Sequence, residues 1–103
     1  MATNKEKIIN FLIINFFKYP DLQDQILKGL VAGLKDDIWT NRMKIIEFLN
    51  KILSENSTLI KKYDEDLEVL YLETDIDVVR EINDFLLKYP NFLFQVPNFH
   101  KYL

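Results

Sequence analysis

The sequence predicts an all-α fold built from antiparallel helical hairpins. Apolar residues recur at spacings of three and four along the chain, and almost never at the spacing of two that is typical of strands. Similar strings, "KIINFL", "KIIEFL" and "EINDFL", begin at Lys7, Lys44 and Glu81, so successive copies lie 37 residues apart. Only two Gly and three Pro occur in 103 residues, which excludes long flexible linkers and Gly-rich phosphate loops. We expect one domain, residues 1–103, with about five to six helices.

Start and stop signals divide the chain into five helical stretches. The first starts where Thr3 and Glu6 form a capping-box pattern, and the second follows Pro20. The later stretches open at polar or acidic N-cap residues: Asp36 or Asp37, Ser57, and Thr74 with Asp75 and Asp77. Breaks are expected at Tyr19-Pro20, Lys35-Asp37, Glu55-Ser57, Glu73-Thr74 and Tyr89-Pro90. The stretches are about 13–18 residues long, and an irregular tail follows them.

The spacing of 37 residues extends over both helices of a hairpin. The first helices of the three copies share an Ile, a Phe and a Leu in register: Ile8, Ile45 and Ile82; Phe11, Phe48 and Phe85; Leu12, Leu49 and Leu86. The alternate helices continue the register: Leu22 with Leu59, Ile26 with Tyr63, Leu30 with Leu67, and Leu34 with Tyr71. This period predicts a short α-solenoid with approximate repeats at 1–36, 37–73 and 74–103. The alternative is an irregular helical bundle, because the out-of-register pair Phe92-Leu93 shows that such strings also arise by chance.

Two strings resemble the second helix of HEAT-like and armadillo-like helical repeats: "DDIWTNRMKIIEFLNKI" from Asp36 and "TDIDVVREINDFLLKYP" from Thr74. In that family an Asp that opens the helix lies five residues before an Arg. Asp37 with Arg42 and Asp75 with Arg80 have this spacing, and the two pairs are 38 residues apart. The resemblance implies an α-solenoid in which Asp37, Arg42, Asp75 and Arg80 stack as a ladder between repeats. The first copy lacks both residues, as a terminal capping repeat can.

A charged surface is expected beside the apolar core positions. If Ile45, Phe48 and Leu49 face the core, the residues between them face away, and the period carries this face to the next copy. The partner-binding candidates are therefore Lys44, Glu47, Lys51, Glu81, Asp84 and Lys88. An acidic cluster provides a second set of candidates for a basic partner: Asp64, Glu65, Glu68, Glu73 and Asp77. Solvated charges that only keep the protein soluble are the alternative interpretation of both sets.

Charge and composition limit the classes of partner. Residues 1–51 carry eight Lys or Arg and six Asp or Glu, whereas residues 52–103 carry five and ten. The basic candidates for nucleic acid are diluted by acids, so we do not expect nucleic acid as the main partner: they are Lys28, Lys35, Lys44, Lys51, Lys61 and Lys62. The apolar run Ile8 to Phe17 is too short to span a bilayer, and no signal cleavage site follows it. With no Cys, the sequence fits a cytoplasmic protein without a membrane segment.

Enzyme chemistry finds little support in the sequence. The single His, His100, has no Cys to activate and no Asp close to it, so we expect no catalytic residue. The alternating acids from Glu73 to Asp77 lack the Gly and the final Glu of a calcium loop, and helix N-capping explains them better. No metal and no cofactor are therefore predicted.

Both ends of the chain are unusually apolar. The run from Ile8 to Phe17 leaves almost no polar face on the first helix, so the tail or another chain is expected to cover it. The tail carries five apolar residues at short steps, Phe92, Phe94, Val96, Phe99 and Tyr102, as a strap over apolar surface does. We expect a non-enzymatic protein-interaction or adaptor module. The alternatives are a homo-oligomeric structural protein joined through the first helix and the tail, and a nucleic-acid-associated helical-repeat protein.

Overall fold

The computed structural model describes residues 4–89, and the predicted strap and His100 lie outside them. The described part is helical and contains no strand, so the all-α prediction is confirmed. Its elements are α1 (Asn4–Phe16), η1 (Pro20–Leu22), α2 (Gln23–Ala32), η2 (Gly33–Lys35), α3 (Trp39–Glu55), α4 (Thr58–Lys61), η3 (Asp66–Leu72) and α5 (Ile76–Lys88). Here η denotes a 3₁₀ helix.

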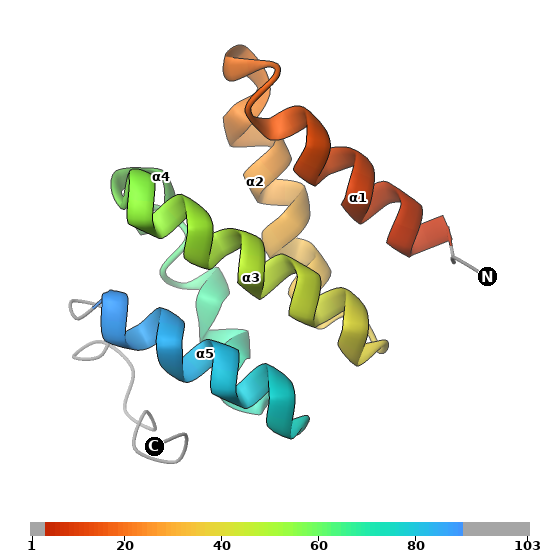
Figure 1. Cartoon of the computed structure of the whole chain (residues 1–103), viewed down its shortest axis with the longest axis vertical. Coiled ribbons are helices and arrows are strands. Elements are labelled where there is room, and N and C mark those ends of the chain that lie inside the picture. The colour runs from red at the N-terminus through yellow and green to blue at the C-terminus, as the bar shows by residue number, and fades with distance from the viewer. Residues whose placement is uncertain (1–3, 90–103) are drawn as a thin grey trace.

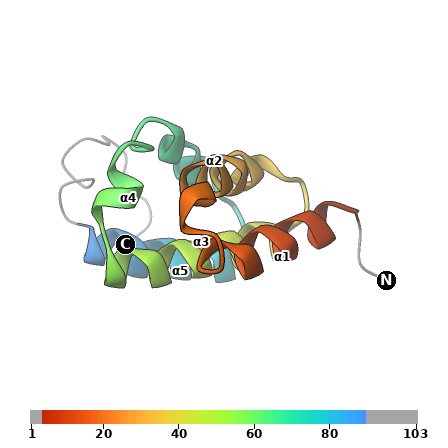
Figure 2. The ribbon, with the colours of Figure 1, turned by 90° about the horizontal axis from the view of Figure 1, so that it is seen from above.

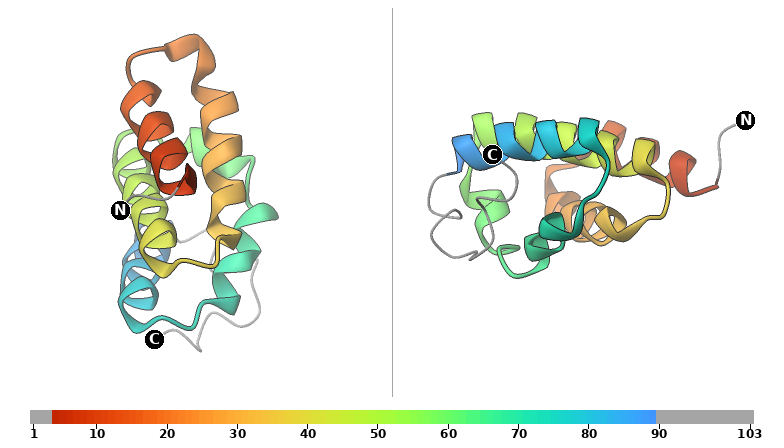
Figure 3. Two further views of the ribbon diagram at one scale, coloured as in Figure 1. Left: turned by 90° about the vertical axis from the view of Figure 1, so that its right-hand side faces the viewer. Right: turned by 90° about the horizontal axis from the view of Figure 1, so that it is seen from below.

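The helices form two layers. α1, α3 and α5 lie side by side and run in the same direction, with α3 in the middle (Figure 1). α2 and the segment from α4 to η3 form the second layer behind this row, as the views from above and below show (Figures 2 and 3). In the second layer α2 contacts η3, and the two layers meet where α1 contacts α2 and where α3 contacts η2 and α4. α1 and α5 are therefore the two outer helices of the row.

The predicted core face is correct for the two later copies. Ile45, Leu49, Ile82 and Phe85 are completely buried, and Phe48 and Leu86 are nearly so. α3 contributes most to the core because it has a neighbour on each side. In the second layer, the paired positions Ile26 and Tyr63, and Leu30 and Leu67, are buried as the spacing of 37 residues predicts.

The first copy departs from this pattern. Ile8 and Phe11 are 58% and 64% exposed, whereas Ile9 and Phe16 are buried in their place. The Phe16 ring meets the Phe48 ring edge to face at 5.3 Å. α1 is apolar on nearly every side, so its sequence does not specify a buried face; packing against α2 and α3 selects one. Their register with the buried residues of the two later copies therefore does not place Ile8 and Phe11 in the core.

The predicted fourth helix is not continuous. α4 ends at Lys61, and a turn leads to the 3₁₀ helix η3. Asp64 and Glu65 lie in this turn and Asp66 begins η3. Asp favours turns over helix interiors, and like charges repel one another. Tyr63 is buried there, and its hydroxyl donates to Asp24 Oδ1 on α2 at 2.6 Å. This bond ties the turn to the second layer.

Acidic side chains fix the starts of α3 and α5. Asp75 Oδ1 accepts from the backbone N–H groups of Asp77 and Val78, so Asp75 is the N-cap of α5, one residue after the expected Thr74. Before α3, Asp36 Oδ1 accepts from the N–H of Ile38 at 2.9 Å. That hydrogen bond lowers the pKa of Asp36 below its ordinary value; burial opposes it, and the hydrogen bond from Asn41 adds a smaller lowering. The N-cap of α3 is Ile38, which makes no side-chain cap bond, so Asp36 holds the turn before the helix and neither Asp36 nor Asp37 is its N-cap.

Candidate interaction surface

The most distinctive surface is the apolar end formed by α1 and α2. Two openings lie along the groove between these helices, with volumes of about 370 and 240 Å³. One is lined by Ile8, Leu12, Gly29 and Ala32 among others, and the second by Phe11, Tyr19 and Leu22 among others. We call the surface made by Ile8, Phe11, Leu12, Tyr19, Leu22, Gly29 and Ala32 the α1/α2 face.

Glycines allow α1 to approach α2 closely and α3 to approach η2 closely. A Cβ atom on Gly29 would lie 3.2 Å from Leu12 Cδ1, and one on Gly33 would lie 2.7 Å from Ile45 Cδ1. The first contact is tight and requires Leu12 to shift by a few tenths of an ångström, whereas the second is a clash with the buried Ile45. Gly29 and Ala32 also leave little side chain on the α2 side of the groove. The floor of the groove is therefore shallow, apolar and set by helix packing.

Lysines surround the α1/α2 face. Lys5 and Lys35 line its first opening, and Lys7, Lys18 and Lys28 are exposed on the same elements. Two of the nearby acids are engaged elsewhere, whereas Asp36 lines the first opening and Asp21 is exposed on η1. Glu6 pairs with Lys44 of α3 at 2.7 Å, and Asp24 pairs with Lys62 beyond α4. The rim of this end is therefore basic, although the whole chain carries a net charge of -3.

The first three partner-binding candidates lie together in another groove. Lys44, Glu47 and Lys51 line an opening of about 360 Å³ between α1 and α3. Lys44 Nζ donates to Glu6 Oε1 at 2.7 Å and to Asn10 Oδ1 at 3.3 Å. Lys51 Nζ lies 5.4 Å from the centre of the Phe17 ring. Two of these three side chains are thus engaged with α1 of the same molecule.

The other three candidates are also bonded within the chain. Glu81 is partly buried, and its Oε1 accepts from Asn50 Nδ2 at 2.6 Å across the contact between α3 and α5. Asp84 and Lys88 form an exposed ion pair at 3.2 Å along α5. The six candidates consequently do not form one continuous surface, because Glu81 contributes to the packing of α5 and not to a free face.

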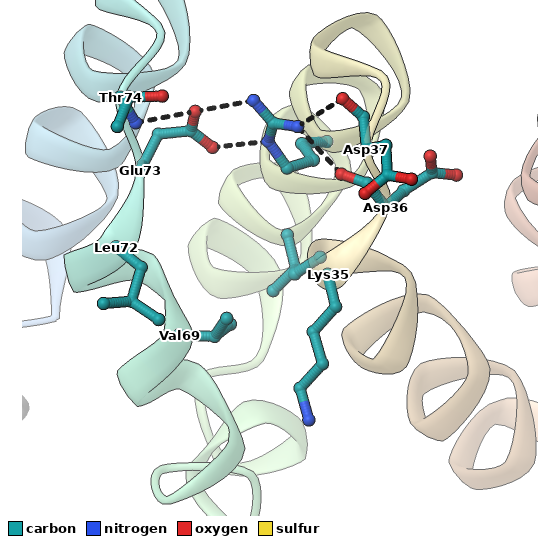
Figure 4. Close-up of a pocket in the computed structure, with 9 residues that line it drawn as sticks. Lys35, Asp36, Asp37, Val69, Leu72, Glu73 and Thr74 are labelled. Atoms are coloured by element: carbon teal, nitrogen blue, oxygen red, sulfur yellow. Dashed lines mark hydrogen bonds and ion pairs between the residues drawn. The ribbon is translucent and has the colours of Figure 1, made fainter.

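The ladder that the resemblance implies is not formed, because Arg42 has a different partner in the structure. Arg42 Nε and Nη2 donate to Glu73 Oε1 and Oε2 at 2.7 and 2.8 Å, and Nη1 donates to the carbonyl oxygens of Asp36 and Asp37 (Figure 4). Glu73, and not Asp75, therefore accepts the guanidinium. Arg80 instead pairs with Asp77 at 3.6 Å on the exposed side of its own helix.

The Arg42 and Glu73 pair closes one end of the molecule. It lies beside an opening of about 510 Å³ between η2 and η3, which Leu34, Val69 and Leu72 also line. Burial raises the pKa of Glu73, but the bonds from Arg42 and from the N–H groups of Asp75 and Thr74 outweigh it and leave the pKa below its ordinary value. The hydrogen bond to Glu73 raises the pKa of Arg42. Both groups are therefore ionised at neutral pH.

The acidic candidates are dispersed by the fold. Glu73 is an internal ion-pair partner, and Asp77 pairs with Arg80. Asp64 Oδ1 accepts the Tyr89 hydroxyl at 2.8 Å, and Glu65 and Glu68 are exposed. Burial first and this hydrogen bond second raise the pKa of Tyr89, and the same two causes with Asp24 raise that of Tyr63. Glu73 must accordingly be removed from the acidic surface.

Sequence reasoning did not anticipate three polar residues of the interior. Asn41 Nδ2 donates to Asp36 Oδ2 at 3.2 Å, and Asn50 binds Glu81 as described above. Both Asn residues are buried. The sequence does contain a signal for these buried Asn residues, namely polar residues among the core positions of α3. Asn41 lies four residues before Ile45, and Asn50 directly follows Leu49.

Within residues 4–89, no group of three or more His, Asp or Glu side chains is arranged to hold a metal ion. None of the described helices is both long and apolar enough to cross a membrane. Comparisons with protein-family models, curated proteins and solved structures find no match to this chain.

Proposed function

We propose that this protein is a non-enzymatic protein-interaction module that binds its partner at the α1/α2 face. The observation that carries the proposal is the exposure of large apolar side chains on the α1/α2 face: Ile8 at 58%, Phe11 at 64%, Tyr19 at 47% and Leu22 at 43%. Single exposed apolar residues are common on protein surfaces, but a contiguous apolar groove with a charged rim is typical of a binding site. The absence of Cys from the sequence fits a cytoplasmic setting for this interaction.

Rigidity supports this choice of surface. Phe16, Leu27 and Leu30 are buried directly beneath the α1/α2 face, and Gly29 brings Leu12 into close contact with α2. The two helices hold the exposed side chains in fixed positions, so a partner orders little of this protein when it binds. The charged groove of Lys44 and Lys51 is a weaker candidate, because its side chains would have to leave internal partners first.

A photoreactive phenylalanine analogue tests the proposal in cells that make the protein. With the analogue at Phe11, we expect a discrete cross-linked product heavier than the chain alone. With the analogue at Ser57, an exposed residue in the turn between α3 and α4, we expect no such product. The substitution Ile8→Asp should then lower the yield at position 11. Equal yields at both positions, or a yield that Ile8→Asp leaves unchanged, would reject the α1/α2 face as the binding surface.

A further inference from the structure

We infer that the occupant of the α1/α2 face is the α5 side of a second copy of this chain, so that copies stack head to tail. This inference rests on the function proposed above. It is more specific, because it names the partner and the surface with which the partner binds.

Among residues 4–89, the row of helices has two edges that no other helix covers. α3 is covered by α1 on one side and by α5 on the other, whereas α1 and α5 each contact α3 with one side only (Figure 1). α5 exposes Ile76 and Leu87 at 64% and 66%. These residues are 11 positions apart, which is close to three helical turns, so they share one side of the helix. This side lies opposite the buried Ile82 and Phe85, and its apolar residues match the exposed Ile8 and Phe11 at the other edge.

The two edges carry opposite charge. Lysines surround the α1/α2 face, as described above, and two of its acids, Glu6 and Asp24, are paired with lysines of other elements. From Asp64 to Asp84 the chain carries nine acids and a single base, Arg80. On α5 itself Asp77 and Asp84 are paired with Arg80 and Lys88, so the excess of acid at this edge comes from the exposed Glu65, Asp66 and Glu68 of η3 and the turn before it. Opposite charges around two apolar surfaces favour association between them and select its orientation.

A symmetric contact between two copies is disfavoured by the same charges. Packing α1 against α1 places lysine rims together, and packing α5 against α5 places acids together. Head-to-tail packing brings α5 of one copy beside α1 of the next, and all three helices of the row run in the same direction. Such a contact is heterologous, so each copy keeps one free edge and chains of copies grow until the contact closes into a ring.

Mixing two variants tests the inference. For the wild type we expect a mass that rises with protein concentration in light scattering and falls when salt screens the charges. Phe11→Asp prevents binding at the α1 edge, and Leu87→Asp prevents binding at the α5 edge. Each variant alone should therefore be monomeric. An equimolar mixture should form a dimer and nothing larger, because one intact edge of each kind remains. Asn56→Asp adds the same charge in the turn after α3, where its oxygen still accepts from Thr58, and should assemble like the wild type.

Several outcomes would overturn the inference. One is a wild-type protein that stays monomeric at every concentration. This outcome would count against the inference even if the monomer bound vesicles of anionic lipid. Another is a Leu87→Asp variant that assembles while Phe11→Asp does not, since this indicates a symmetric α1 contact. A mixture that remains monomeric also contradicts it. If either Asp variant loses its thermal transition, Phe11→Ala and Leu87→Ala replace the pair. Cross-linking at Phe11 to a different protein, with no self-association, would reject the second copy and leave the proposed function intact.

Discussion

Arg42 and Glu73 are 31 residues apart in the sequence, yet their side chains form a bidentate pair with N–O distances of 2.7 and 2.8 Å. The side chains are only 16% and 5% exposed. Arg42 belongs to α3, and Glu73 ends the 3₁₀ helix that precedes α5. The pair therefore joins the central helix to the segment that leads into the outer helix, and it fixes where α5 begins.

Arg42→Ala should destabilise the protein by about 2–4 kcal/mol, because it leaves the carboxylate of Glu73 buried without its partner. Arg80→Ala is the matched control, since the Arg80 and Asp77 side chains are 75% and 52% exposed. Its cost should stay below about 1 kcal/mol. Urea unfolding of both variants measures the difference. Equal effects of the two substitutions would contradict the structural role of the Arg42 pair.

The stability of the wild type should fall with acid partly through Glu73. The pKa of Glu73 is below 4.5 in the folded protein, so its contribution is present above the unfolded pKa and is lost as the pH falls through the folded pKa. Glu73→Gln removes this titration but leaves the depressed pKa of Asp36 in place. The free energy of unfolding of Glu73→Gln should therefore decline less steeply below pH 4.5. Parallel pH profiles for the two proteins would show that Glu73 titrates normally in the fold.

Phe11 and Phe48 occupy the same place in the 37-residue spacing but have opposite roles. Phe48 is buried and its ring packs on that of Phe16, so Phe48→Asp should abolish the cooperative thermal transition. Phe11 is exposed, so Phe11→Asp should change the free energy of unfolding by less than about 1 kcal/mol. Differential scanning calorimetry compares the two directly. Loss of the transition in Phe11→Asp would mean that the sequence spacing, and not the packing described above, identifies the core of α1.

The two glycines should respond differently to Ala. At Gly33 the added methyl group meets Ile45, which is completely buried, so overpacking of about 1–3 kcal/mol outweighs the gain in helix propensity. At Gly29 the neighbour is Leu12, which is only partly buried and can shift. Gly29→Ala should therefore be within about 0.5 kcal/mol of the wild type or slightly more stable. Thermal unfolding checks both, and a destabilised Gly29→Ala with an unaffected Gly33→Ala would reverse the assignment.

The sequence predicted the core best where a helix has neighbours on both sides. α3 and α5 carry one apolar stripe each, and Ile45, Phe48, Ile82 and Phe85 lie where the helical period places them. α1 has apolar residues on nearly every side, so periodicity does not select Ile9 and Phe16 over Ile8 and Phe11. The only sign of the α1/α2 face in the sequence is that α1 lacks a polar side. Which residues stay exposed depends on the neighbours of α1.

The polar contacts were less predictable than the core. Lys44, Glu47 and Lys51 do share a face, as helical spacing requires, but Glu6 and Asn10 on another helix bind Lys44. The Arg42 partner is Glu73, because η3 ends close to the start of α3, and the predicted continuous fourth helix did not include that turn. Contacts between residues about 30 positions apart depend on the exact path of such turns. The spacing of Asp and Arg along the chain contains no information about that path.

The most direct test of the central claim uses the absence of Cys from this sequence. Single-cysteine variants F11C, L87C and S57C each carry one thiol, and a short bis-maleimide joins thiols that lie close together. A mixture of F11C with L87C should yield cross-linked dimer faster than either variant alone, and a mixture of S57C with L87C should yield little. Dimer that forms as fast from F11C alone as from the mixture, or at the same rate in every combination, would contradict head-to-tail binding at the α1/α2 face.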